Sequence, residues 1–107
     1  MAIYSEAIDT YLVYHLNTDN TYDQSGVINC YLGNSYKGSL YFYRDGASIP
    51  ASSRSGSGYL YLRFNANQMM EILETLRQET PLTIWFNDVN LWGGLTTSKE
   101  PIGEEES

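Results

Sequence analysis

Apolar and polar residues alternate along much of this chain, and this alternation predicts strands. Successive side chains of a strand point to opposite faces, so short alternating runs rich in Tyr, Leu, Val and Ile are typical of half-buried strands. Polar segments with Gly, Asn, Asp and Ser separate these runs and predict turns. We expect about six strands, at residues 10–16, 27–32, 39–43, 59–64, 82–87 and 91–97. The Ser/Gly-rich residues 51–58 are expected to form a flexible loop.

One segment has helical rather than strand spacing. Met69, Ile72, Leu73 and Leu76 fall at i, i+3, i+4 and i+7, which places them on one face of a helix. Asn65 and Gln68, three residues apart, form a variant capping box before this stripe, and Pro81 ends the helix after it. We therefore predict one amphipathic helix at about residues 66–79, packed on one face of a sheet.

These elements predict an α+β fold: a mostly antiparallel sheet with one covering helix. A chain of 107 residues has room for one domain, which we place at residues 1–97. Residues 98–107 read as an acidic tail, either flexible or docked on a neighbouring subunit.

The predicted strands have one aliphatic and one aromatic face. Leu40, Phe42, Leu60, Leu62 and Ile84 belong to the aliphatic face, which the helix should cover. The opposite set is Tyr41, Tyr43, Tyr59, Tyr61, Arg63 and Trp85. Tyr, Trp and Arg are enriched at the hot spots of protein interfaces, so we expect another subunit, another protein or a ligand to cover this face. The alternative is that tyrosines are good strand formers that stay half exposed without a partner.

Charge and hydropathy narrow the classes of partner. The net charge is −7, from six basic and thirteen acidic residues. Long nucleic acids and anionic membranes are bound through many Lys and Arg side chains, so we expect neither as a partner. The sequence starts without a basic, then apolar, leader and has no run of about 18 apolar residues. We therefore expect a cytoplasmic protein.

Catalytic and metal-binding patterns are weak. His15 and Cys30 are the only possible Cys–His pair, but Cys30 alternates with core positions and is expected to be buried and inert. Asn17, Asp19, Thr21 and Asp23 alternate as in a calcium loop, yet Tyr22 stands where the turn glycine belongs and no glutamate closes the loop. We predict no catalytic residue, no metal and no cofactor.

The arginines offer a second type of site. Arg54 lies in the Ser/Gly loop, where backbone amides can form an anion-binding nest, although a plain hairpin loop explains the same composition. Arg44 and Arg63 adjoin the strands that carry Tyr43, Tyr59 and Tyr61. Arginine beside tyrosine suits a phosphate and a base.

The sequence thus predicts a non-catalytic binding module, homo-oligomeric through its aromatic sheet face and engaging a protein partner. The alternative is sequestration of a small anionic ligand, such as a nucleotide signal, at Arg44, Arg54 and Arg63 and the nearby tyrosines. An enzyme of unknown type is the third hypothesis.

Overall fold

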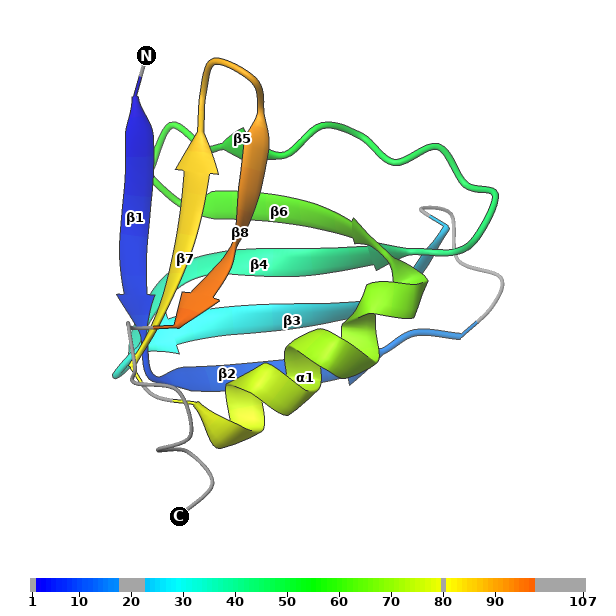
Figure 1. The fold of residues 1–107 in the computed structure, drawn as a ribbon, viewed down its shortest axis with the longest axis horizontal. Coiled ribbons are helices and arrows are strands. Elements are labelled where there is room, and N and C mark those ends of the chain that lie inside the picture. Colours follow the sequence, from blue (N-terminus) through cyan, green and yellow to red (C-terminus); the bar gives the residue numbers. More distant parts are fainter. Residues whose placement is uncertain (1, 18–22, 80, 98–107) are drawn as a thin grey trace.

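A computed structural model of the chain describes residues 2–17, 23–79 and 81–97, and it confirms the α+β class (Figure 1). Within these residues, eight strands form two sheets beside one helical segment. In chain order the elements are β1 (Ile3–Ile8), β2 (Thr10–His15), β3 (Gln24–Leu32), β4 (Ser35–Tyr43), β5 (Ser53–Arg54), β6 (Leu60–Asn65), the 3-10 turn η1 (Ala66–Gln68), α1 (Met69–Gln78), β7 (Leu82–Asn87) and β8 (Trp92–Thr97).

The structure has two strands that the sequence did not predict, β1 and β5, and both occur where the apolar pattern is weak. In β1 the partly or fully buried side chains Tyr4, Glu6 and Ile8 alternate with exposed ones, but a glutamate at the centre breaks the apolar signal. Glu6 is held there by Lys37, whose Nζ lies 3.6 Å from its carboxylate. β5 lies inside the segment predicted to be a flexible loop, where Ser53 pairs with Tyr61 of β6. That prediction was wrong for these two residues because backbone pairing does not require an apolar side chain.

The strands form a five-stranded sheet, ordered β2-β3-β4-β6-β5, and a three-stranded sheet, ordered β1-β7-β8. Every pairing is antiparallel except that of β4 with β6, which is parallel. A parallel pair needs a long connection to bring the chain back to the same end, and residues 44–59 supply it. The expectation of a mostly antiparallel arrangement is therefore confirmed, with two sheets in place of one.

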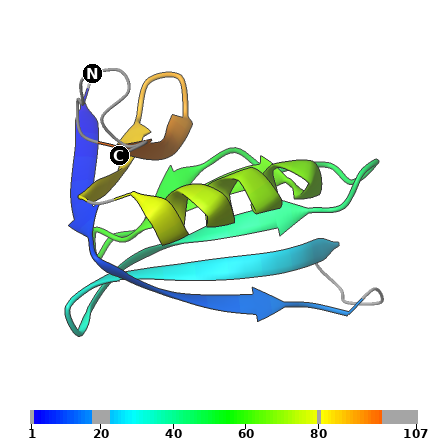
Figure 2. The ribbon, with the colours of Figure 1, turned by 60° about the horizontal axis from the view of Figure 1, so that its bottom comes forward.

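The helix and the small sheet lie on the same side of the large sheet. Figure 1 shows β1, β7 and β8 running across the large sheet at one end, with α1 beside them, and Figure 2 shows both above the layer of β2, β3, β4 and β6. The other face of the large sheet has no element of the described chain upon it.

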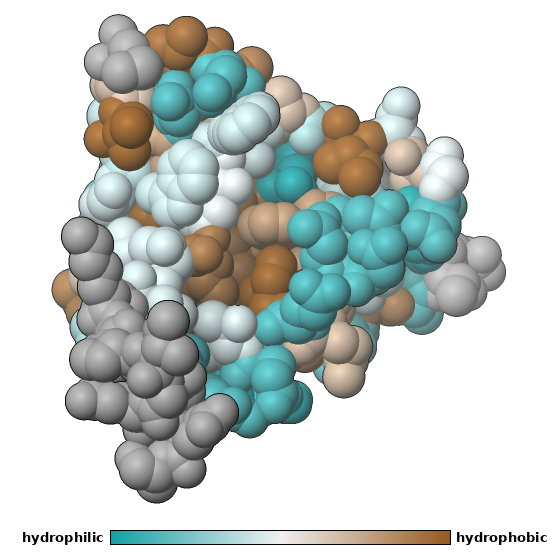
Figure 3. Space-filling view, viewed as in Figure 1, coloured by the Kyte–Doolittle hydropathy of each residue, from teal (hydrophilic) through white to brown (hydrophobic). Residues whose placement is uncertain are grey.

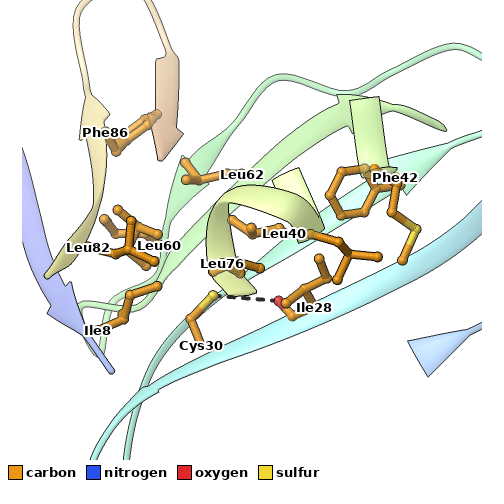
Figure 4. Packing of buried hydrophobic residues seen from close by; sticks show 13 residues of the cluster. Ile8, Ile28, Cys30, Leu40, Phe42, Leu60, Leu62, Leu76, Leu82 and Phe86 are labelled. Atoms are coloured by element: carbon orange, nitrogen blue, oxygen red, sulfur yellow. Dashed lines mark hydrogen bonds between the residues drawn. The ribbon is translucent and has the colours of Figure 1, made fainter. Parts of the chain in front are cut away.

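The core fills the space between these layers (Figure 4). Fully buried side chains of the large sheet meet side chains of the small sheet and of α1 there, and the main ones are Ile28, Cys30, Leu40, Phe42, Leu60, Leu62, Ile8, Leu82, Ile84, Phe86, Met69, Leu73 and Leu76. The predicted helix stripe is confirmed, with Ile72 partly buried at its margin. So is the capping box, because the Asn65 side chain accepts from the Asn67 amide while the Gln68 side chain accepts from the Asn65 amide.

None of the helices in the described ranges is long and apolar enough to cross a membrane. The predicted acidic tail, residues 98–107, lies outside the described residues.

Candidate binding face

The uncovered face of the large sheet gathers tyrosines from three neighbouring strands. Register places Tyr61 beside Ser39 and Arg63 beside Tyr41, which in turn lies beside Val27 of β3. We call this surface the tyrosine face and define it by Tyr31, Tyr36, Tyr41, Tyr59, Tyr61 and Arg63, all partly exposed. Four of these six residues, Tyr41, Tyr59, Tyr61 and Arg63, were assigned to the aromatic face from sequence.

The rings on this face are packed edge to face rather than scattered. Tyr36 lies between Tyr31 and Tyr59, with ring centroids 5.7 and 4.8 Å away, and Tyr41 lies 6.1 Å from Tyr61. These T-shaped pairs are a preferred geometry of aromatic side chains. The face is therefore an ordered surface whose side chains are already held in place.

A polar network fixes the centre of the face. The Tyr36 and Ser39 hydroxyls are hydrogen bonded to each other, and the Ser39 hydroxyl also donates to Asn29 Oδ1 at 2.7 Å. Burial raises the pKa of Tyr36 to about 12. Ser39 is almost completely buried, so the network lies beneath the rings.

Arg63 is the cation of the tyrosine face. Its guanidinium carbon lies 5.6 Å from the centroid of the Tyr41 ring, and its Nη1 donates to the Ala51 carbonyl at 2.6 Å and the Ser53 hydroxyl at 3.1 Å. Its Nε is buried and has no hydrogen-bond partner among the residues described. The side chain is thus positioned by β5 and the segment before it.

Tyr43 does not belong to the accessible surface. It follows the same alternation as Tyr41 but is only 6% exposed, and its hydroxyl accepts from Gln24 Nε2 at 3.3 Å. The prediction that Tyr43 contributes to an exposed binding face was wrong, because neighbouring structure near the end of β4 covers the ring.

Trp85 was also misplaced by the prediction of a single aromatic face. It lies in β7, in the small sheet, across from Gly94. Alternation within a strand separates inward from outward residues, but it does not say to which sheet the strand belongs. Trp85 therefore belongs to the small sheet and alternates with the buried Ile84 and Phe86, but it lines a groove between the two sheets together with Arg63.

The small sheet carries a separate apolar patch. Ile3, Val89, Leu91 and Trp92 are all exposed around the end of this sheet where β7 turns into β8. Figure 3 shows apolar atoms at this end, beyond the polar surface of α1.

The three candidate arginines do not converge. Arg44 is held after the end of β4, with its Nη1 3.8 Å from Asp23 Oδ1 and its Nη2 donating to the Asn17 carbonyl at 2.8 Å. The guanidinium carbon of Arg54 lies 4.1 Å from the centroid of the Tyr4 ring, on the side away from the tyrosine face. Arg54 pairs with Leu60 of β6, which in turn pairs with Gly38 of β4. Arg44 is six residues beyond Gly38 in the direction of β4, which separates the backbones of Arg44 and Arg54 by roughly 20 Å along the strands. Only Arg63 lies on the tyrosine face.

The Cys–His pair is also far apart in space. Cys30 is fully buried, as predicted, its thiol faces the Ile28 carbonyl at 3.8 Å, and burial raises its pKa to about 12. Cys30 lies opposite Tyr11 of β2. The exposed His15 is four residues further along that strand. In the described ranges no three His, Cys, Asp or Glu side chains are grouped for a metal ion. Asp19 and Thr21 of the calcium-like segment lie outside those ranges.

The charge distribution sets the large sheet apart from the rest of the chain. Its five strands contain no Asp or Glu, although the chain has thirteen acidic residues. The only charged side chains in these strands, apart from His15, are the cations Lys37, Arg54 and Arg63. The tyrosine face is therefore free of carboxylates in a protein of net charge −7.

Tyr31 and Tyr36 were not assigned to the face from sequence. Tyr31 is in phase with Val27 and Asn29, so alternation in β3 was a usable signal. Tyr36 was missed because the predicted strand began only at residue 39 and the pairing shifts register between Cys30 and Tyr31. Comparisons of the chain with protein-family models, with curated proteins and with solved structures find no match.

Proposed function

We propose that this protein is a non-catalytic binding module that associates with itself through the tyrosine face. The observation that carries the proposal is an ordered, carboxylate-free aromatic surface on a sheet face that no described element covers. Tyrosines bring large contact area at low entropic cost, since each has few rotatable bonds and is already packed against a neighbour.

Charge favours a second copy as the occupant. Copies of a chain with net charge −7 repel each other wherever their acidic residues meet. The tyrosine face lacks acidic residues and presents Arg63, which can lie over a tyrosine ring of the other copy as it lies over Tyr41 here. The face is thus where two copies approach with least repulsion.

The test is the mass of the protein in solution, measured by native mass spectrometry and sedimentation equilibrium. Replacing Tyr41 and Tyr61 together with Ser should reduce the mass by one association step. Trp92→Ser is the matched control, because it removes an aromatic side chain that is 67% exposed on the other sheet. An unchanged mass in the Tyr41/Tyr61 variant overturns the proposal.

Capture of a small anionic ligand is the second candidate function, and one observation favours it. Arg63 is a cation that lies over the Tyr41 ring, in a sheet whose strands contain no Asp or Glu. Under this alternative, native mass spectra of the protein as purified contain extra mass of nucleotide size. Arg63→Ala should weaken that binding by about 1.5–3 kcal/mol, the value of a charge-assisted hydrogen bond, whereas Arg54→Ala should leave it unchanged.

A further inference from the structure

The outer edge of β2 is paired with no strand among the residues that the structure describes. β2 is the outermost strand of the large sheet, and its six residues, TYLVYH, include no Lys, Arg, Asp, Glu, Pro or Gly. Its pairing with β3 runs without a register shift. Proteins normally blunt such edges with charges, prolines, bulges or very short strands, so a regular apolar edge marks a site for strand pairing.

The other edges of the two sheets carry such features. β5, at the opposite edge of the large sheet, has only two residues. β1 has a glutamate at its centre, paired with Lys37, and β8 contains Gly93 and Gly94. Among the strands described, β2 therefore offers the best edge for another strand.

The hydrogen-bond pattern shows which backbone groups of β2 point outward. The Leu16 amide donates to the Ser25 carbonyl at 2.9 Å, in continuation of the β2–β3 pairing. Backbone groups of an antiparallel strand point to one side and the other in turn, so Thr10, Leu12 and Tyr14 also bond to β3. Tyr11, Val13 and His15 then direct their amides and carbonyls to the open edge.

We propose that β2 pairs antiparallel with β2 of a second copy of this chain, around a two-fold axis at Val13. In this register Val13 faces its own copy and Tyr11 faces His15 of the second copy, so all three outward-facing residues exchange both backbone hydrogen bonds. Centring the pair on Leu12 would leave His15 opposite Asp9, whose amide already donates to the Tyr31 carbonyl. The Val13 register is the one that satisfies the whole edge.

The same register covers the exposed apolar side chains of β2. Leu12 and Tyr14 are each 46% exposed, and Leu12 of one copy lies opposite Tyr14 of the other in a pair without direct hydrogen bonds, where side chains approach most closely. A symmetric interface of this kind is self-complementary and closes as a dimer. It joins two large sheets into one, with both tyrosine faces on the same side.

This pairing goes beyond the proposed self-association through the tyrosine face, because it uses the backbone edge of β2, although Leu12 and Tyr14 lie on the same side of the large sheet as that face. If both contacts form, the assembly is a tetramer, and loss of either contact leaves a dimer. The two proposals can therefore fail independently.

Engineered disulfides test the edge pairing and its register. Opposite residues of a pair without direct hydrogen bonds have Cα atoms about 4.5 Å apart, within the range that a disulfide spans. The double variant Leu12→Cys/Tyr14→Cys should therefore form a covalent dimer on mild oxidation, seen on a non-reducing gel. The native Cys30 is fully buried and should not take part.

The single variant Leu12→Cys is the register control. In the proposed register the two copies of Leu12 are diagonal neighbours, about 7–8 Å apart, too far for a disulfide. A covalent dimer in the double variant alone is the expected result. Cross-linking of the single variant, or none in the double variant, overturns the pairing around Val13.

A charge substitution provides a second test that leaves the core untouched. Leu12→Lys should remove one association step in sedimentation, halving the mass, because two copies bring like charges close together. Leu32→Lys makes the same change at a side chain that is 43% exposed on β3, away from the edge, and should leave the mass unchanged. A Leu12→Lys variant with wild-type mass contradicts the edge pairing. If the disulfide of the Leu12→Cys/Tyr14→Cys variant still forms when Tyr41 and Tyr61 are also replaced with Ser, the edge pairing does not depend on association through the tyrosine face.

Discussion

The side chain of Leu62 occupies the space that a side chain on Gly93 would need. A Cβ atom at Gly93 would overlap Leu62 Cδ2 and lie 2.7 Å from the Trp85 carbonyl oxygen. Leu62 is a fully buried residue of the large sheet and Gly93 belongs to the edge strand of the small sheet. Their contact sets how closely the two sheets pack at this point.

Gly93→Ala should therefore destabilise the fold. Overpacking a well-packed core costs about 1–3 kcal/mol, and here the obstacle includes a backbone carbonyl that does not move freely. Gly94→Ala is the matched control, because a Cβ there would lie 3.1 Å from Trp85 Nε1 and could be accommodated by a small shift of the ring. In urea unfolding, the free energy of unfolding of Gly93→Ala should be well below that of Gly94→Ala. Equal free energies of unfolding for the two variants would contradict this account of the contact.

The core and the helix were predictable from sequence because they depend on local periodicity. Alternation identified Leu40, Leu60 and Ile84 as inward-facing, and all three are fully buried. The spacing of Met69 and Leu73 identified the helix. These signals lie within a few residues, and burial of one face is enough to produce them.

The division into two sheets was not predictable in the same way. Trp85 alternates with Ile84 and Phe86 whichever sheet β7 joins, so its place in the small sheet depends on pairings distant in the sequence. The arginines show the same limit. Only the registers of β4 with β6 and of β5 with β6 reveal that Arg44 and Arg54 are far apart while Arg63 lies against Tyr41.

The capping box at the start of the helical segment should contribute measurably to stability. Asn65 satisfies the Asn67 amide at 2.9 Å, and Asn65→Ala removes that acceptor from the first turn. Loss of an N-cap side chain costs about 1 kcal/mol. Asn67→Ala, at an exposed position of the same turn, serves as the control in thermal and urea unfolding. A loss of stability at Asn67 as large as that at Asn65 would argue against the cap.

The Cys30 thiol should be inert in the folded protein. It is fully buried, and its pKa of about 12 keeps it protonated at neutral pH, whereas the thiolate is the reactive form. A thiol reagent such as Ellman's reagent at pH 8 should label Cys30 only after denaturant is added. Rapid stoichiometric labelling of the native protein would contradict the buried position on β3.

Stability should fall as pH rises above about 9, with Cys30 and Tyr36 as two of the causes. Burial raises the pKa of Cys30 from 9.0 to about 12 and that of Tyr36 from 10.0 to about 12. Both groups hold their protons more tightly when folded, so above pH 9 the unfolded chain binds fewer protons and the free energy of unfolding decreases with pH. The contribution is fully present below pH 9 and is lost as pH approaches 12.

Tyr36→Phe isolates the tyrosine contribution to this pH dependence. The variant loses the hydrogen bond to Ser39, so its stability at pH 7 should be somewhat lower than that of the wild type. Between pH 10 and 12, however, its free energy of unfolding should decline less steeply, because one group with a raised pKa has been removed. Urea unfolding at a series of pH values measures both effects. Parallel curves for the two proteins would mean that the Tyr36 hydroxyl is not desolvated as its position against Ser39 requires.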